Sequence, residues 1–518
     1  MKRFAAGRAI LSLLTVAALL FGLMGTAFAN TGTPGWQEPT KPGWKDGEAQ
    51  RGWIQSKIEH MTLEEKVGQM FMPYGYGTSA GDTTYAVSNQ KVLGTDTMAQ
   101  AVEQYHLGGL IYFNWNYNIN LPMDPAQVAT LSNDLQTAAM GQRLPIPLLI
   151  ATDQEMGVVV RADYPATQFP GNMALGAARD PKYAETAATI TGREIRALGI
   201  NMNLAPVLDV NINPDNPVIG VRSFGGDPQL VSSLGVAAVG AYQQNVIATA
   251  KHFPGHGDTA TDSHVGLPLI THTREQLDTI DLVPFRAAVD AGIDAVMTAH
   301  ILVPALDDSG LPATFSKPIL TDLLKGEMGF RGIVITDALT MAGAKVFQTE
   351  EEMPVKAILA GVDLILMPEH LPLQYNAVLN AVKDGTIPME RIDDAVYRIL
   401  RVKMKQGLFN DSFTTLEAAQ AIGSPENMAQ ADLVADKTIT LLRNDAGLLP
   451  LTANGQKVLV TGYGLTTTAS LAGYLNERGL TATVYQTGTS PGASVIANAV
   501  AKAADADLII VSTYNMRP

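Results

Sequence analysis

Eight short apolar runs recur along the chain, and helical segments separate them. Each run is about as long as a buried strand, and it is continuously apolar rather than alternating. The runs occupy residues 69–73, 108–113, 147–153, 200–206, 246–252, 293–300, 332–338 and 362–368. Helices are expected between them, for example over residues 181–198 and 274–291. This alternation predicts an α/β fold, a closed TIM-like (β/α)8 barrel, with an open doubly wound sheet as the alternative.

Polar residues come at the ends of several of these runs. Asp153 ends the third run, Lys251 and His252 end the fifth, and Asp337 comes at the end of the seventh. Turns account for one or two polar residues at strand ends, but they account poorly for a basic pair and two lone aspartates. In (β/α)8 barrels the chemistry lies at the C-terminal ends of the strands. The placement of these residues therefore favours the barrel over the open sheet.

The sequence divides into five segments. We expect a signal peptide at residues 1–29, a linker at 30–52, the catalytic barrel at 53–410, linker helices at 411–436 and a smaller α/β sandwich domain at 437–518. Early in the barrel, Thr62 and Glu65 predict a capping box at the start of a helix. The last segment follows a βαβαβ pattern. Because the sequence stops just after the third core strand of that pattern, we expect the second domain to be incomplete at its C-terminus.

The N-terminus is typical of a secretory signal peptide. Lys2, Arg3 and Arg8 precede an apolar run over residues 10–23, and an A-x-A cleavage pattern ends at Ala29. The apolar run is short for a membrane anchor, which needs about 20 residues. The chain contains no cysteine, so it has neither a disulfide nor a lipid-modified cysteine. We therefore expect a secreted protein without stable membrane insertion, and we expect it to be a monomer.

The overall charge limits the class of partner. The chain carries 36 Lys and Arg against 50 Asp and Glu, a formal net charge of −14, and no local basic patch offsets it. Such a chain is poorly suited to bind nucleic acid or anionic lipid. Hydrophobic residues make up 46% of the chain, which is enough for a large core. We therefore expect a globular protein with no nucleic-acid partner.

The segment KHFPGHGDTATDSH, residues 251–264, holds three of the chain's eight histidines together with two aspartates. A metal site is one interpretation, but the spacing matches no HExxH or similar signature. A phosphate-binding loop is another, but the Gly-Lys-Ser/Thr ending of such loops is absent. We therefore expect no metal and no cofactor. Taken alone, the segment is best interpreted as a solvated loop above a barrel strand with an ordinary Asp-His pair. A role in proton transfer depends on the other residues at the mouth of the barrel.

Asp262 and His264 in this loop form a candidate acid/base pair. A carboxylate beside an imidazole can fix its tautomer, and histidine titrates near neutrality, so it can both give and take a proton. Asp337 is the candidate nucleophile, because glycoside hydrolysis needs one carboxylate to attack the anomeric carbon and a second group to protonate the leaving oxygen. The mouth of the barrel gains further charged groups that suit a polyhydroxyl ligand, namely Asp153, Arg161 and Arg222.

Four motifs together resemble those of glycoside hydrolase family 3: KHFPGHGDTATDSH, VRSFGGDP, DQEMGVVVR and GIVITDALTM. The resemblance covers the chain from about Met61 to Gly407, and the histidine-containing DSH loop resembles the β-N-acetylglucosaminidase branch. The resemblance implies that Asp337 is the nucleophile, His264 the general acid/base and Asp262 its partner. It also implies that the terminal sugar is held by Asp153, Arg161, Arg222, Lys251 and His252.

One position departs from the family pattern. The family usually has two glycines after the D-x-E motif, whereas this chain has Met156 and Gly157. A larger side chain at this point would narrow the rim of the sugar subsite. The departure bears on the fit of the sugar, not on the reaction.

The resemblance implies a retaining exo-β-N-acetylglucosaminidase that acts through a covalent glycosyl-enzyme, and the N-terminal signal pattern adds the expectation that it is secreted. Its substrates would be cell-wall (muropeptide) or chitin fragments that carry terminal N-acetylglucosamine. A β-glucosidase or β-xylosidase of the same family, with a glutamate acid/base in the second domain, is the main alternative. A phosphorolytic variant, in which phosphate replaces water, is another. Two functions of other classes also remain as alternatives: a carbohydrate-binding protein with an inactive site, and a metal-dependent hydrolase.

Overall fold

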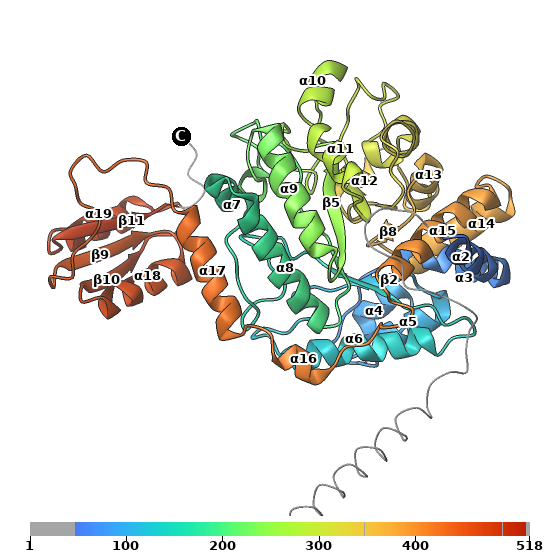
Figure 1. The fold of residues 1–518 in the computed structure, drawn as a ribbon, viewed down its shortest axis with the longest axis horizontal. Helices are drawn as coiled ribbons and strands as arrows, with labels where there is room; N and C mark the ends of the chain where they lie inside the picture. The colour runs from blue at the N-terminus through green and yellow to red at the C-terminus, as the bar shows by residue number, and fades with distance from the viewer. Residues whose placement is uncertain (1–46, 347, 489, 514–518) are drawn as a thin grey trace, which may run out of the picture. The chain divides into compact units, whose positions relative to one another are not determined.

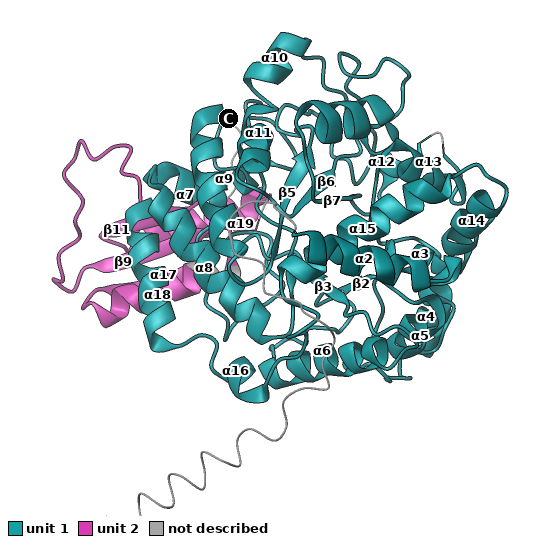
Figure 2. Ribbon diagram, turned by 45° about the vertical axis from the view of Figure 1, so that its right-hand side comes forward, with its two compact units in different colours: residues 1–438 teal, residues 439–518 magenta. Residues whose placement is uncertain are grey.

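The computed structural model describes residues 47–346, 348–488 and 490–513. The chain divides into two compact units, Met1–Thr438 and Ile439–Pro518 (Figure 2). The expected signal peptide and residues 30–46 of the expected linker lie outside the described residues.

Six parallel strands form a curled sheet in the first unit (Figure 1). Their order in space, β2-β3-β4-β5-β6-β7, is also their order along the chain. The strands are β2 (Gly109–Ile111), β3 (Leu149–Thr152), β4 (Met202–Asn203), β5 (Ile247–Phe253), β6 (Ala295–Thr298) and β7 (Ile333–Ile335). A doubly wound sheet reverses its strand order at a switch point. The sequential order contradicts that alternative for the first unit.

Two further strands, β1 (Phe71–Met72) and β8 (Ile365–Leu366), pair in parallel with each other, with Phe71 opposite Ile365. Backbone hydrogen bonds connect their surroundings to the two ends of the six-stranded sheet. The Ile111 N–H donates to the Pro73 carbonyl at 3.1 Å, and the Leu364 N–H donates to the Val334 carbonyl at 3.1 Å. The structure thus shows a six-stranded parallel half-barrel and a separate strand pair, where the sequence predicts one closed barrel of eight strands.

Every residue in these strands is buried, as the continuously apolar runs predict. Most strands are shorter than the run that predicts them, and β1 and β8 have two residues each. The polar residues that follow the strands are therefore free to lie in loops at one edge of the sheet, where they can meet.

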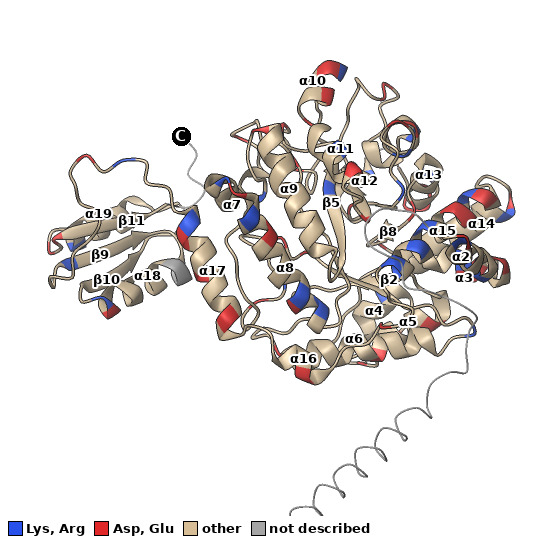
Figure 3. Ribbon diagram, viewed as in Figure 1, with Lys and Arg blue, Asp and Glu red and all other residues tan. Residues whose placement is uncertain are grey.

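Helices surround the strands of the first unit (Figure 1). The helical segments are α2 (Glu48–His60), α3 (Leu63–Gln69), α4 (Ala86–Leu93), α5 (Met98–Tyr105), α6 (Pro125–Met140), α7 (Asn172–Ala178), α8 (Pro181–Ala197), η1 (Gly220–Arg222), α9 (Pro228–Tyr242), α10 (Arg274–Thr279), α11 (Val283–Asp290), η2 (Ala313–Phe315), η3 (Pro318–Glu327), α12 (Ala342–Lys345), α13 (Glu352–Ala360), α14 (Leu371–Lys383), α15 (Met389–Lys405), α16 (Leu416–Gln420) and α17 (Pro425–Thr438). Residues of both charge signs are interspersed along them (Figure 3). In the described part of the chain, none of the helices has the length and apolar character needed to span a bilayer.

Local sequence signals explain where several helices begin. The helices α6, α8 and α9 share an N-cap aspartate followed by proline at the first helical position. The aspartate side chain accepts a backbone N–H of the first turn, and the proline has no N–H that would stay unpaired. The capping box predicted at Thr62 and Glu65 starts α3 and is confirmed, with the Thr62 N–H donating to Glu65 Oε2 at 2.8 Å.

The second unit contains a three-stranded parallel sheet of order β10-β9-β11. Its elements are β9 (Lys457–Gly462), α18 (Leu465–Glu477), β10 (Thr481–Gln486), α19 (Ala493–Ala503) and β11 (Leu508–Ser512). This succession confirms the predicted βαβαβ pattern. Apolar residues of β9 and α18, among them Val460 and Leu475, form a small core of its own.

Candidate active site

Charged side chains gather at the carboxyl ends of β3, β4 and β5. Asp153 and Glu155 follow β3, Asp209 follows β4, and Lys251 and His252 belong to β5. Because these strands are parallel neighbours, their carboxyl ends lie at the same edge of the sheet. The structure therefore brings together side chains that are far apart in the sequence.

Glu155 is the centre of this charged network. Its carboxylate accepts two hydrogen bonds from the Arg222 guanidinium, both at 2.8 Å, and lies 2.7 Å from Lys251 Nζ. Only 1% of the Glu155 side chain is exposed. Burial alone would raise the pKa of Glu155, but the charges of Arg222 and Lys251 hold that pKa well below its usual range. Glu155 therefore stays ionised and fixes the position of both cations.

Lys251 connects Glu155 to Asp153. Its Nζ lies 2.8 Å from Asp153 Oδ1, and the Lys251 side chain is 3% exposed against 18% for Asp153. Burial alone would lower the pKa of Lys251, but Asp153 and Glu155 raise it above its usual value. Lys251 is therefore a buried cation, and Asp153 is the more accessible carboxylate beside it.

Asp209 orients two histidines. Its Oδ2 lies 2.8 Å from His252 Nδ1, and its Oδ1 accepts the backbone N–H groups of His252 at 3.2 Å and His256 at 2.7 Å. The other ring nitrogen of His252, Nε2, lies 3.4 Å from Arg222 Nη2. Asp209 is fully buried, and it holds His252 next to the Arg222–Glu155 pair.

Asp337 stands two residues after β7 and is partly exposed. Its Oδ1 accepts the Ala338 N–H at 2.8 Å. Burial alone would raise the pKa of Asp337, but His252, His300 and the Ala338 hydrogen bond lower it below its usual value. The buried His300 ring donates from Nε2 to the Ala338 carbonyl at 3.1 Å, which fixes the backbone beside Asp337. Asp337 is therefore an ionised carboxylate on a well-held segment.

Asp262 and His264 are in direct contact. His264 Nδ1 lies 2.7 Å from Asp262 Oδ1, and the same oxygen accepts the His264 N–H at 2.9 Å. The His264 side chain is 59% exposed and that of Asp262 is 30% exposed. The Gly343 N–H, in the segment that follows Asp337, donates to the Ser263 carbonyl at 3.0 Å. This bond joins the Asp262–His264 loop to the Asp337 segment.

A second set of contacts holds the base of the same loop. His272 Nδ1 lies 2.7 Å from Asp281 Oδ2, and its Nε2 lies 3.0 Å from Asp258 Oδ2. His256 Nδ1 lies 2.6 Å from Thr259 Oγ1, and its Nε2 lies 3.0 Å from Ser263 Oγ. Side-chain contacts thus hold the loop between β5 and α10 together and connect it to the segment before α11.

Two residues lie outside this network. Arg161 does not join it, because its guanidinium lies over the Phe113 ring, 5.3 Å from the centroid. Its buried Nε has no hydrogen-bond partner in the described part of the chain. Met156 has φ +71°, is 6% exposed and lines a small buried cavity with Leu175 and Phe224. The Met156 side chain is therefore mostly buried, and Glu155 lines the same cavity, so the narrowed rim of the sugar subsite stays a prediction.

Glu155 and Asp209 are not among the site residues predicted from the sequence. Glu155 has a detectable signal, because it stands two residues after Asp153 in the DQEMG motif. Asp209 also has one, because it is a lone carboxylate in the apolar stretch NLAPVLDV, which overlaps the end of the fourth run and continues it. Both are buried and act on the predicted residues: Glu155 on Lys251 and Arg222, Asp209 on His252.

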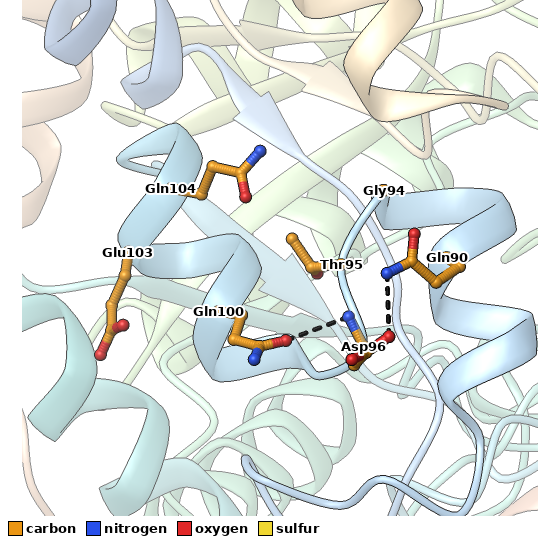
Figure 4. Close-up of a pocket in the computed structure, with 7 residues that line it drawn as sticks. All are labelled: Gln90, Gly94, Thr95, Asp96, Gln100, Glu103 and Gln104. Atoms are coloured by element: carbon orange, nitrogen blue, oxygen red, sulfur yellow. Dashed lines mark hydrogen bonds between the residues drawn. The ribbon is translucent and has the colours of Figure 1, made fainter.

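A separate polar groove of about 510 Å³ lies between α4 and α5 (Figure 4). Three of its polar residues are paired with one another: Gln90 donates to Asp96 at 2.8 Å, and the Asp96 N–H donates to Gln100 at 3.0 Å. None of the predicted site residues lines it. Over the described ranges, no group of three or more His, Cys, Asp or Glu side chains has the geometry to hold a metal ion.

Comparison with known proteins agrees with the geometry. Residues 62–402 match the family model "Glycosyl hydrolase family 3 N terminal domain". The chain is 39% identical over 386 residues to "Beta-hexosaminidase A" of Pseudoalteromonas piscicida, and the match covers 70% of this chain and 63% of that protein. It is 34% identical over 412 residues to "Beta-N-acetylglucosaminidase/beta-glucosidase" of Cellulomonas fimi, covering 77% of this chain and 68% of that protein.

A solved structure matches over most of the chain. It is a glycoside hydrolase family 3 beta-N-acetylglucosaminidase from Paenibacillus sp. str. FPU-7, with 40% sequence identity and a TM-score of 0.79. The match covers 88% of this chain and 85% of that one. The family model, which spans residues 62–402, covers the segments that hold the network, the loop and Asp337.

Proposed function

Since this chain belongs to glycosyl hydrolase family 3, we propose that it is a retaining exo-β-N-acetylglucosaminidase. One observation carries the proposal: the hydrogen bond from Gly343 to Ser263 joins the Asp262–His264 loop to the segment that follows Asp337. Hydrolysis with retention needs a carboxylate nucleophile and a group that gives and takes a proton. The names of the two relatives from P. piscicida and C. fimi support an N-acetylhexosamine as the sugar.

In the first step, Asp337 attacks C1 of the terminal sugar. The bond between C1 and the glycosidic oxygen breaks, its electron pair goes to that oxygen, and His264 donates a proton to it. The lowered pKa of Asp337 keeps this carboxylate ionised and able to attack. The products are the free aglycone and a glycosyl ester on Asp337.

In the second step, water attacks C1 of this ester. His264 accepts the proton of the water, and the bond between C1 and Asp337 breaks. Two displacements at C1 return the sugar with its original configuration. Asp262 holds His264 Nδ1, so that Nε2 is the nitrogen that carries the mobile proton.

We assign the terminal-sugar subsite to the network at the ends of β3 and β5. Asp153 and Lys251 supply a carboxylate and an ammonium beside each other for the sugar hydroxyls. The unpaired Nε of Arg161 is a further donor. Arg222 and His252 complete the subsite, held by Glu155 and Asp209. Apart from Arg161, these charged groups are paired with one another or with Glu155 and Asp209. Charges held in this way have little freedom, so they favour one orientation of the sugar.

The proposal extends to architecture and location. We take the six-stranded sheet and the β1–β8 pair as one closed (β/α)8 barrel, which the bonds from Ile111 to Pro73 and from Leu364 to Val334 support. We also propose that the protein is secreted, on the evidence of the basic residues, apolar run and A-x-A pattern that end at Ala29. Cell-wall or chitin fragments outside the cell would then be its substrates.

The initial rate on an aryl β-N-acetylglucosaminide, set against the matching aryl β-glucoside, tests the proposal. We expect a strong preference for the acetamido sugar. Equal or reversed rates would move the assignment to a broad β-glycosidase. The C. fimi relative is named for both activities, so the two substrates have to be compared directly. Adding phosphate and analysing the product separates hydrolysis from phosphorolysis, since phosphorolysis releases the sugar as a 1-phosphate.

A further inference from the structure

Six aromatic side chains form a continuous cluster beside the proposed site, which we call the aromatic rim. Tyr74 and Tyr76 follow β1, Tyr85 is the N-cap of α4, and Phe113, Trp115 and Tyr117 follow β2. The distances between ring centroids are 4.9 Å for Phe113–Trp115, 5.2 Å for Tyr74–Trp115, 5.8 Å for Tyr74–Tyr76, 6.4 Å for Tyr76–Tyr85 and 4.7 Å for Tyr85–Tyr117. No step of the proposed reaction uses these rings.

The rim reaches the surface. Trp115 is 47% exposed and Tyr117 is 44% exposed, while Phe113 at the base of the cluster is 5% exposed. The remaining tyrosines are partly buried. Large aromatic rings that are packed together and still open to solvent mark a binding surface more often than a structural one.

The rim borders the proposed site on two sides. The Arg161 guanidinium lies over Phe113, and Asn114 Nδ2 donates to the Arg161 carbonyl at 3.4 Å. On the other side, Lys345 of α12 pairs with Glu369 at 2.6 Å. Glu369 comes two residues after Met367, whose N–H donates at 2.9 Å to the carbonyl of Met72, two residues before Tyr74. Because α12 follows Asp337, the rim lies between the sugar-binding arginine and the nucleophile segment.

Buried asparagines hold the backbone of the rim in place. Asn89 exchanges two hydrogen bonds with the backbone of Tyr76, at 2.8 and 2.9 Å. Asn116 and Asn118 donate to the Gly75 carbonyl at 2.9 and 3.1 Å, and Asn118 also donates to the Gly77 carbonyl at 3.1 Å. All three asparagine side chains are fully buried. These bonds connect the loops after β1 and β2, so the rings are held ready for a ligand.

We infer that the aromatic rim binds the second and following sugars of a neutral N-acetylglucosamine oligosaccharide, on the reducing side of the bond that is cleaved. The inference rests on the proposed function and names the substrate class of the same site. An exo-acting enzyme encloses the terminal sugar, so the rest of the chain has to leave through the mouth. The apolar faces of sugar rings pack on aromatic rings. Asp82 adds negative charge beside Tyr85, since its Oδ1 accepts the N–H of the neighbouring Thr84 at 2.8 Å, and this charge disfavours an acidic peptide as the aglycone.

Chain-length selectivity tests the inference. We compare kcat/KM for chitotetraose with kcat/KM for N-acetyl-β-glucosaminyl fluoride, whose leaving group is a single atom that cannot reach the rim. For Trp115→Ala and Tyr117→Ala, the ratio of the two values should fall about tenfold each, the effect of about 1.4 kcal/mol of lost stacking. An unchanged ratio in both variants would overturn the inference.

Phe413→Ala is the matched control. Phe413 is also 44% exposed. Its neighbour Thr414 donates a hydrogen bond to the Ala197 carbonyl, which comes just before the amino end of β4, so Phe413 lies away from the mouth. Its selectivity ratio should equal that of the wild type.

A binding experiment separates failure of the inference from failure of the proposed function. If the wild-type protein cleaves neither substrate, the proposed function fails. The rim can still be tested by calorimetric titration of chitotetraose into two proteins, Asp337→Asn and the double variant Asp337→Asn with Trp115→Ala. Equal affinities there would overturn the inference. Sedimentation of the wild type and of Trp115→Ala tests a different role for the rim, as a contact between copies of the chain. A dimeric wild type that the substitution converts to a monomer would overturn the inference.

Discussion

The Asp262 carboxylate accepts both the ring and the backbone N–H of His264, with Oδ1 at 2.7 Å from Nδ1 and at 2.9 Å from the amide nitrogen. Burial alone would raise the pKa of Asp262, but the two hydrogen bonds and the His264 ring lower it. The carboxylate therefore stays ionised beside the imidazole. One oxygen fixes the loop backbone and the ring orientation together.

Asp262→Asn tests this arrangement. The amide oxygen can still accept both N–H groups, so the loop should keep its conformation, but the charge that stabilises a protonated imidazole is lost. We expect kcat on an N-acetylglucosamine oligosaccharide to fall by about 10²-fold or more. Asp308→Asn, an exposed aspartate outside the site, is the control. A kcat within twofold of the wild type for Asp262→Asn would contradict the pairing.

Substitution of His264 and Asp337 should impair the enzyme in different ways. His264→Ala removes the proton donor, so turnover of natural substrates should fall by about 10²–10⁴, and activated aryl glycosides should be affected less. Asp337→Ala removes the nucleophile, so both substrates should be turned over at nearly background rates. The two variants are compared by initial rates on both substrate types.

Azide distinguishes the two roles chemically. In His264→Ala, azide should attack the glycosyl-enzyme from the face that water uses and give the β-glycosyl azide. In Asp337→Ala, azide should take the place of the nucleophile and give the α-glycosyl azide. NMR of the products reads the configuration. Undiminished turnover of natural substrate by His264→Ala, or a β product from Asp337→Ala, would reverse the assignment.

Some of the proposed site residues carry a local signal in the sequence. Asp337 stands at the end of a continuous apolar run, and Asp262 and His264 stand two positions apart. The strands were predictable for the same reason, because burial on both faces leaves an unbroken apolar run. Their exact lengths were not, since hydrogen bonding between neighbours decides where each strand ends.

Glu155 and Asp209 were missed because they act through distant partners. Glu155 is 67 positions from Arg222, and Asp209 is 43 positions from His252. Each carboxylate looks like an ordinary charged residue until the strands bring it to its partner. The buried direction of the Met156 side chain was not predictable either. It depends on a left-handed backbone conformation at φ +71° that no single-residue pattern reveals.

Glu155→Gln should destabilise the first unit strongly. The substitution leaves the Arg222 guanidinium and the buried Lys251 ammonium without their shared carboxylate, and breaking such a buried pair costs about 3–5 kcal/mol. Because the native pKa of Glu155 is lowered, this stability is complete above the unfolded pKa near 4.5 and is lost as pH falls below it. Urea unfolding at pH 7 measures the loss. Glu185→Gln, an exposed position on α8, should leave the free energy of unfolding unchanged.

His256 should make stability depend on pH in a higher range. Burial lowers the pKa of His256 to about 4, since the ring is enclosed between Thr259 and Ser263, and Asp209 only partly offsets this. In the unfolded chain the same ring titrates near 6.5, so between pH 6.5 and 4 unfolding takes up a proton that the native ring does not hold. The contribution of His256 to the free energy of unfolding is therefore complete above pH 6.5 and is lost as pH falls. The loss at pH 4 is about 3 kcal/mol.

The wild type and His256→Gln are compared by urea unfolding at several pH values from 7.5 to 4.5. The variant should be less stable at pH 7 but should lose less stability on acidification, because one proton uptake is removed. Burial raises the pKa of Asp281 to about 6, so the folded protein takes up a proton there before the unfolded chain does as pH falls. This proton adds to the free energy of unfolding on acidification, and its contribution should be equal in both proteins. His60→Gln, at an exposed histidine, should keep the slope of the wild type. Parallel profiles for His256→Gln and the wild type over this range would show that His256 titrates normally in the folded protein.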